Sequence, residues 1–274
     1  MSETTAIAPR PRVMTAAAAL KASAAFWFVT AAAGQIAFIW FITAFYLPPT
    51  LLGQFEAWNR KALITGYVAG DAAGNLNFAV HVVLAAAITA SGLLQLVPAI
   101  RRRAPRFHRW NGRIYLVLAS IMSLGGLWLV WVRGTYLTIP GAISISMLAV
   151  LTLAAGAITL RHAMKRRFAL HERWALRLFI LVSGVWFQRV GYMAWIILNG
   201  GPVGIGPRMD GPFDLAWGFG QFVLPLAALE LYFRAKRARS PGAKLAVAGL
   251  VTALTLVMAV GIFGTVAIMW WRFL

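Results

Sequence analysis

The chain of 274 residues contains no cysteine. This absence excludes disulfide bonds, thiolate metal sites, iron–sulfur clusters and cysteine nucleophiles. Charged residues are scarce too: they make up 12% of the sequence, whereas a soluble domain carries about a quarter. Apolar residues make up 61%, and the mean hydropathy is +0.75. The composition therefore predicts an integral membrane protein.

The sequence also lacks the common motifs of soluble-type catalysis. It has no GxGxxG dinucleotide fingerprint, no GxxxxGK[ST] phosphate loop, no HExxH zinc motif and no GxSxG elbow with a credible triad. Acid pairs suited to glycoside hydrolysis are missing from the apolar runs. These absences disfavour a soluble-type enzyme.

Seven apolar runs are long enough to cross a bilayer, which takes about 20 residues. They are continuous and do not alternate, so we expect an all-α integral membrane fold and not a β-barrel. The runs cover residues 24–47, 78–100, 114–132, 140–160, 175–198, 216–233 and 245–270. We expect four regions: a cytoplasmic N-terminal segment over 1–23, a first transmembrane helix over 24–47, a core membrane domain over 78–235 (spans two to six), and a seventh helix within 245–274.

Acidic residues are few, so the net charge is +19, and the basic residues are unevenly distributed. The N-terminus and the segments 101–113, 161–173 and 234–244 carry 19 Lys and Arg, while the alternate segments carry 5. Basic residues are retained on the cytoplasmic side. The pattern predicts a bacterial inner-membrane protein with its N-terminus inside and its C-terminus outside. It favours anionic lipid, and not nucleic acid, as the partner of the basic face.

Two similar sequence segments, each with a basic cluster followed by a His, lie at the inner ends of spans three and five. They are RRRAPRFHRWNGRIY (101–115) and MKRRFALHERWALRLF (164–179). His108 and His171 are 63 residues apart, which is about the length of one helical hairpin. The similarity of the two segments predicts that spans two to five form a four-helix core of two parallel hairpin repeats, related by an axis along the membrane normal.

The histidines are the first candidate site. His108, His162 and His171 all lie at the expected inner face, and a bis-histidine haem needs two imidazoles from different helices. His108 and His171 are the predicted iron ligands, with His162 as a substitute. The flanking Arg109, Arg113 and Arg177 would pair with haem propionates. The alternative is that each histidine only meets headgroups or a neighbouring carbonyl at a helix start.

Arg189 is the second candidate. It lies ~15 Å inside the fifth span at 1.5 Å per residue, and Glu230 lies ~20 Å inside the sixth. A charge at such depth costs at least ~2.5 kcal/mol and should face the bundle interior. One reading is a buried Arg189–Glu230 pair that locks two helices. The other is a ligand cavity, formed with His81 and Gln188, that takes an anionic or carbonyl-bearing group such as a quinone headgroup or a haem propionate.

The phrases FHRWNGRIY and HERWALRLF, together with Arg189 and Glu230, resemble an uncharacterised family of bacterial predicted membrane proteins with HRWxGRxY and HxRWxxR motifs. The likeness covers roughly residues 78–235 and implies no activity. It directs attention to His108, Arg109, Gly112, Arg113, Tyr115, His171, Arg173, Trp174, Arg177, Arg189 and Glu230. The chain resembles the transmembrane cytochrome b and ferric reductase superfamily more distantly. It departs from that pattern because His81 has no histidine partner at the outer face.

Two functions remain open at this point. The first is a membrane oxidoreductase with a single haem b that passes electrons from a quinol or a similar donor. The second is a cofactor-free transporter or binding protein for a small molecule or lipid, with a central Arg–Glu cavity. A homodimer or a partner subunit is compatible with either function.

Overall fold

The computed structural model describes residues 14–60 and 65–273 and is helical throughout, with no strand in these ranges. Most of the predicted N-terminal segment, including residues 1–13, lies outside the described residues, as does Lys61. The helices are α1 (Ala16–Leu51), α2 (Ala72–Leu96), α3 (Pro98–Arg103), α4 (Pro105–Trp131), α5 (Ile139–Met164), α6 (Phe168–Val182), α7 (Gly184–Leu198), α8 (Pro212–Arg237) and α9 (Pro241–Gly264). A 3₁₀ turn, η1 (Phe55–Arg60), follows α1, and η2 (Thr265–Trp270) and η3 (Trp271–Phe273) continue α9.

Six of these helices are long and apolar enough to cross a membrane: α1, α2, α4, α5, α8 and α9 with its continuation to Trp270. Several begin at side-chain caps, since the oxygens of Thr15, Asp71, Thr138 and Ser240 each accept from a backbone N–H in the first turn. The α2 helix begins six residues before the predicted span, so His81 lies in its third turn and not in its first. The all-helical, multi-span class is therefore confirmed.

The predicted fifth span is not one continuous helix. It consists of α6 and α7, which are bent by 56° at Ser183 and can count as one broken span. Gly184 follows the break and lies against Leu148, whose Cδ2 would be 2.7 Å from an added Cβ. Gln35 of α1 donates a hydrogen bond of 3.0 Å to the Ser183 hydroxyl. The break is therefore supported by contacts from α1 and α5.

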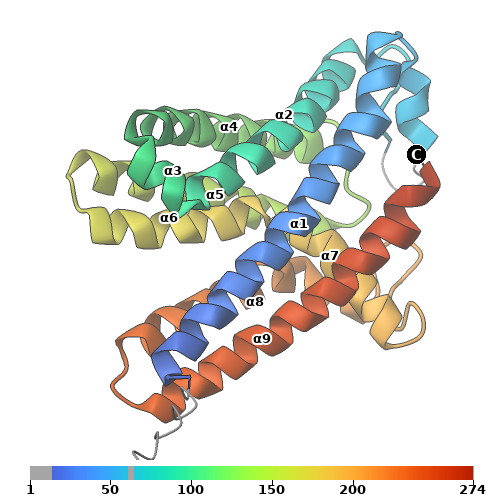
Figure 1. Ribbon diagram of the computed structural model, residues 1–274. Helices are drawn as coiled ribbons and strands as arrows, with labels where there is room; N and C mark the ends of the chain where they lie inside the picture. The colour runs from blue at the N-terminus through green and yellow to red at the C-terminus, as the bar shows by residue number, and fades with distance from the viewer. Residues whose placement is uncertain (1–13, 61–64, 274) are drawn as a thin grey trace, which may run out of the picture.

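The helices form two groups that meet at this break. In Figure 1, α1 and α9 lie side by side and run in the same direction, while α2, α4, α5 and α6 gather on the other side of the molecule. Within the second group, α2 packs on α4, α4 on α5, and α5 on α6. These neighbours are the ones that two consecutive hairpins require; the symmetry of the predicted repeat stays a prediction.

Close approach of α7 and α9 depends on small residues. A Cβ added at Gly261 of α9 would overlap the backbone carbonyl of Val190 on α7, and one added at Gly264 would lie 2.5 Å from Ile197 Cδ1. Small residues allow membrane helices to pack backbone against backbone. The position of α7, and of every side chain it carries, therefore depends on this seam.

We predict that Gly261→Ala lowers the thermal unfolding midpoint of the detergent-solubilised protein, because the added methyl group must push α9 away from α7. Overpacking of this kind costs about 1–3 kcal/mol. Gly249→Ala is the matched control in the same helix, because no atom lies within 4 Å of an added Cβ there. Equal midpoints for the two variants would contradict the observed seam.

Candidate functional site

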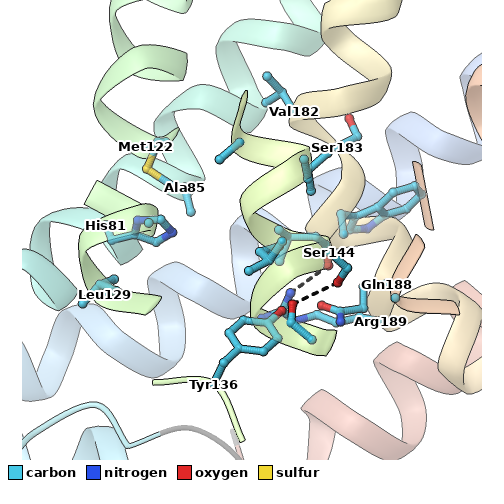
Figure 2. A pocket seen from close by; sticks show the side chains of 18 of the residues that line it. His81, Ala85, Met122, Leu129, Tyr136, Ser144, Val182, Ser183, Gln188 and Arg189 are labelled. Carbon is cyan, nitrogen blue, oxygen red and sulfur yellow. Dashed lines mark hydrogen bonds between the residues drawn. The ribbon is translucent and has the colours of Figure 1, made fainter. Parts of the chain in front are cut away.

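A cavity of about 650 Å³ lies where the two helix groups meet. This volume is within the range of about 300–1,000 Å³ that small-molecule sites occupy. Its walls come from α1, α2, α4, α5, α6, α7 and α8, and two connecting loops contribute to them. Figure 2 shows His81 on one side of the cavity and Tyr136, Gln188 and Arg189 on the other. Most of the remaining lining residues are apolar.

Arg189 lies on α7, six residues beyond the helix break. Its Nη1 donates a hydrogen bond of 2.8 Å to the Val185 carbonyl one turn earlier, and its guanidinium lies 5.6 Å from the ring centre of Phe38. No carboxylate among the described residues is within ion-pair distance of it. A carbonyl and a ring face neutralise a guanidinium only in part, so Arg189 retains an unbalanced positive charge at the cavity wall.

Three further polar side chains line the cavity with this cation. Gln188 hydrogen-bonds the Tyr136 hydroxyl, while its own backbone carbonyl accepts a 3.0 Å bond from the indole of Trp217. Burial raises the pKa of Tyr136, although the Gln188 hydrogen bond and the charge of Arg189 act in the opposite direction. Tyr136 is therefore a neutral hydroxyl near neutral pH. His81 adds an imidazole whose Nδ1 has no hydrogen-bond partner in the described part of the chain.

One end of the cavity is covered by the α7–α8 connection, of which Pro202, Ile205, Gly206, Pro207 and Met209 line the cavity. Asp214, buried at the start of α8, holds this connection. Its carboxylate accepts hydrogen bonds from the Tyr192 hydroxyl (2.7 Å), Gly206 N–H (2.8 Å) and Gly211 N–H (2.9 Å). The connection therefore folds over this end of the cavity. Asp214 is the carboxylate in the cavity lining, and its acceptor capacity is used by the loop.

The predicted inner-face histidines lie elsewhere. His108 and His171 are each in the first turn of their helices, α4 and α6, and are near enough to interact electrostatically. His171 Nδ1 is 3.1 Å from the Thr159 carbonyl, whereas Nδ1 of His108 and Nδ1 of His162 have no partner among the described residues. None of the three is among the residues that line the cavity.

The Arg189–Glu230 pair, one of the two readings of the sequence, is not formed among the described residues. Glu230 accepts a 2.7 Å hydrogen bond from Nε of Arg177, and Arg173 lies 4.0 Å away. Arg177 also packs 4.7 Å from the ring centre of Trp174. Depth estimates placed Glu230 one turn from Arg189, but α8 points this carboxylate toward α6. Glu230 consequently does not line the cavity, unlike His81, Gln188 and Arg189.

Two of the three arginines assigned to haem propionates contact other side chains. Arg177 is held by Glu230, and the Arg113 guanidinium lies 4.7 Å from the ring centre of Trp110. Arg109 forms no ion pair with any described residue. A role for Arg113 or Arg109 near a haem stays a prediction.

The Arg177–Glu230 contact leads to a stability prediction. Glu230→Gln should destabilise the protein by about 1–3 kcal/mol, because a charge-assisted hydrogen bond is lost and Arg177 is left alone. Glu172→Gln is the control: this carboxylate is half exposed and 3.8 Å from Arg101, so its loss should cost about 0–1 kcal/mol.

A double-mutant cycle identifies the partner of Glu230. Thermal unfolding should show coupling between Glu230→Gln and Arg177→Gln, and none between Glu230→Gln and Arg189→Gln. Coupling to Arg189 instead would contradict the observed contacts.

Sequence reasoning missed Tyr136 and Asp214. Tyr136 is in a short connection beside Arg133, where nothing in the sequence distinguishes it from interfacial aromatics. Gln35 is 2% exposed, and its hydrogen bond to Ser183 at the helix break is the interhelical contact that a single Gln in a span usually indicates. Asp214 carries a positional signal, because it is an acid in the first turn of a helix after a Gly- and Pro-rich loop.

The helices that pass the membrane criteria make this chain a multi-pass helical membrane protein. Residues 78–206 match the model of the family described as Predicted membrane protein (DUF2306). The matched stretch is shorter than half of the chain. It contains the inner-face histidines, His81 and Arg189, but it ends before Glu230, so the resemblance expected over 78–235 is supported only to residue 206. No curated protein and no solved structure matches the chain.

Proposed function

We propose that this protein binds amphipathic organic anions inside the membrane, as a carrier or receptor does, with Arg189 as the anion ligand. One observation carries the proposal: a guanidinium in a membrane-embedded bundle lines a 650 Å³ cavity without a carboxylate partner among the described residues. An intramembrane charge is costly and normally has a counterion. A bound anion supplies one.

The surroundings of Arg189 favour an amphipathic ligand. Tyr136, Gln188 and His81 offer hydrogen-bonding groups near the cation, and hydrocarbon side chains line most of the rest of the cavity. The broken α6–α7 pair is a further supporting feature, because discontinuous helices often form the substrate sites of membrane carriers.

We also propose the orientation that the basic residues indicate. Seven spans, with α6 and α7 as one broken span, place the N-terminus in the cytoplasm of a bacterial cell and the C-terminus outside its inner membrane. In this orientation the basic ends of α3, α4 and α6 contact anionic lipid headgroups. The Arg189 end of the cavity then faces the outer leaflet.

A binding experiment on Arg189→Gln tests the proposed function. Purified protein in phosphatidylcholine nanodiscs should bind tritiated dodecanoate, and the variant should bind it roughly 10–100-fold more weakly, since a hydrogen bond to a charged group is lost. Arg113→Gln, which removes a guanidinium outside the cavity, should leave binding unchanged. The apo variant should be at least as stable as the parent protein, because Arg189 has no anionic partner among the described residues.

Two results would refute the anion-binding function. One is equal dodecanoate binding by the parent protein and Arg189→Gln. The other is saturable binding of decylubiquinone, which carries carbonyl groups and no charge, with no competition from dodecanoate.

A haem b site remains a second candidate because of one feature of the inner face. The contact of His171 Nδ1 with the Thr159 carbonyl leaves Nε2 as the available nitrogen, which is how axial histidines are commonly oriented. His108, which lies near it, would be the second ligand, and such a haem would supply single-electron transfer. The cavity supports anion binding better, because it includes neither histidine.

An absorption spectrum decides the haem hypothesis. If it holds, protein purified from haem-sufficient cells shows a Soret band that dithionite shifts. His108→Ala and His171→Ala should each abolish the band, whereas His81→Ala should keep it. A colourless preparation, or a band indifferent to both inner histidines, would exclude this site.

A further inference from the structure

The cavity is elongated along the bundle, and two contacts between α2 and α4 define its length. At the outer level, Gly126 of α4 lies beside His81 of α2, whose Cε1 would be 3.5 Å from an added Cβ. At the inner level, Gly92 of α2 lies beside the ring of Tyr115 on α4, at 3.0 Å. All four residues line the cavity. Eleven residues separate the two levels on each helix, which corresponds to roughly 16 Å.

The wall between these levels is mostly apolar, although Thr89 and Ser123 also line it. Ala85 and Ile88 contribute from α2, Ala119 and Met122 from α4, and Leu148 from α5. The hydroxyls that do occur toward the inner level are mostly used within their own helices: Thr89 donates to the Ala85 carbonyl and Thr152 to the Leu148 carbonyl, at 2.7 and 2.8 Å. This stretch therefore fits a hydrocarbon chain.

Tyr115 differs from these threonines. Its side chain is 5% exposed, its ring forms part of the inner cavity wall, and its hydroxyl has no hydrogen-bond partner among the described residues. A buried hydroxyl without a partner is unfavourable, and native structures seldom tolerate one without a reason. The geometry indicates that a polar group missing from the protein itself satisfies it.

We propose, building on the proposed function, that the ligand is an elongated amphiphile with two polar ends. An anionic group binds Arg189, a hydrocarbon chain fills the apolar stretch, and a hydroxyl or carbonyl group at the inner level, roughly 16 Å from the level of His81, hydrogen-bonds the Tyr115 hydroxyl. An omega-hydroxy or omega-oxo carboxylate of medium chain length has this chemistry. Tyr115 is then the residue that determines specificity for the distal group.

The test compares dodecanoate with omega-hydroxydodecanoate in the same nanodiscs, using competition against tritiated dodecanoate. The parent protein should prefer the omega-hydroxy acid by about fivefold, the value of one neutral hydrogen bond. Tyr115→Phe should remove this preference while keeping dodecanoate binding, because only the hydroxyl is lost. Tyr232→Phe, outside the cavity lining at the inner end of α8, should keep the preference. Unchanged circular dichroism confirms that Tyr115→Phe folds.

The outcomes separate this inference from the function on which it rests. Equal binding of both acids by the parent protein, with no effect of Tyr115→Phe, would overturn the distal contact; a buried water would then satisfy Tyr115, and Arg189-dependent dodecanoate binding would still stand. Absence of binding for both acids would overturn the proposed function and this inference together.

Discussion

A guanidinium that no described carboxylate neutralises is the constraint on which the rest of this structure depends. Arg189 lies within a bundle whose outer surface is in lipid, where an unpaired charge is expensive. The chain has a carboxylate at a similar depth, Glu230, but uses it for Arg177. Asp214 borders the same cavity, yet its oxygens accept from Tyr192 and two loop amides. Each nearby acid is thus committed to structure, and the positive charge is kept available.

The position of Arg189 depends on the helix break and on the close contact between α7 and α9. If α6 and α7 formed a straight helix, the second half would point along the bundle; the 56° bend turns it across the space between the two helix groups. Gln35 supports the break from α1, and Gly261 allows α9 to press against the carbonyl of Val190, the neighbour of Arg189. The cation is therefore positioned by backbone packing, which holds a side chain more firmly than a flexible loop does.

The sequence predicts the class of fold well and the partners of individual side chains poorly. The length and continuity of the apolar runs identify the spans, because every span in lipid must satisfy its backbone hydrogen bonds internally. Arg189 and His81 were found for the same reason, since polarity at membrane depth is visible in one dimension. The partner of Glu230 was not found, because a depth estimate ignores the direction in which a side chain leaves its helix. Arg177 lies near the inner end of the predicted fifth span, and its side chain reaches Glu230 across the α6–α8 contact. The break at Ser183 was also missed, since Ser-Gly inside an apolar run is ordinary in membrane helices.

The cavity wall is polar at one end and mostly apolar toward the other. Its charged and hydrogen-bonding residues, Arg189, Tyr136 and Gln188, lie toward the α7–α8 connection, while the wall beyond His81 becomes hydrocarbon as far as Tyr115. An amphiphile entering from the connection leads with its weakly polar tail and leaves its anionic group beside Arg189, so the charge never crosses the apolar stretch. Entry from the opposite end would carry an anion through roughly 16 Å of hydrocarbon wall before it met a cation. Under the proposed function, such a ligand is loaded from the side of the Asp214-anchored connection, and its chain comes to rest at the level of Tyr115.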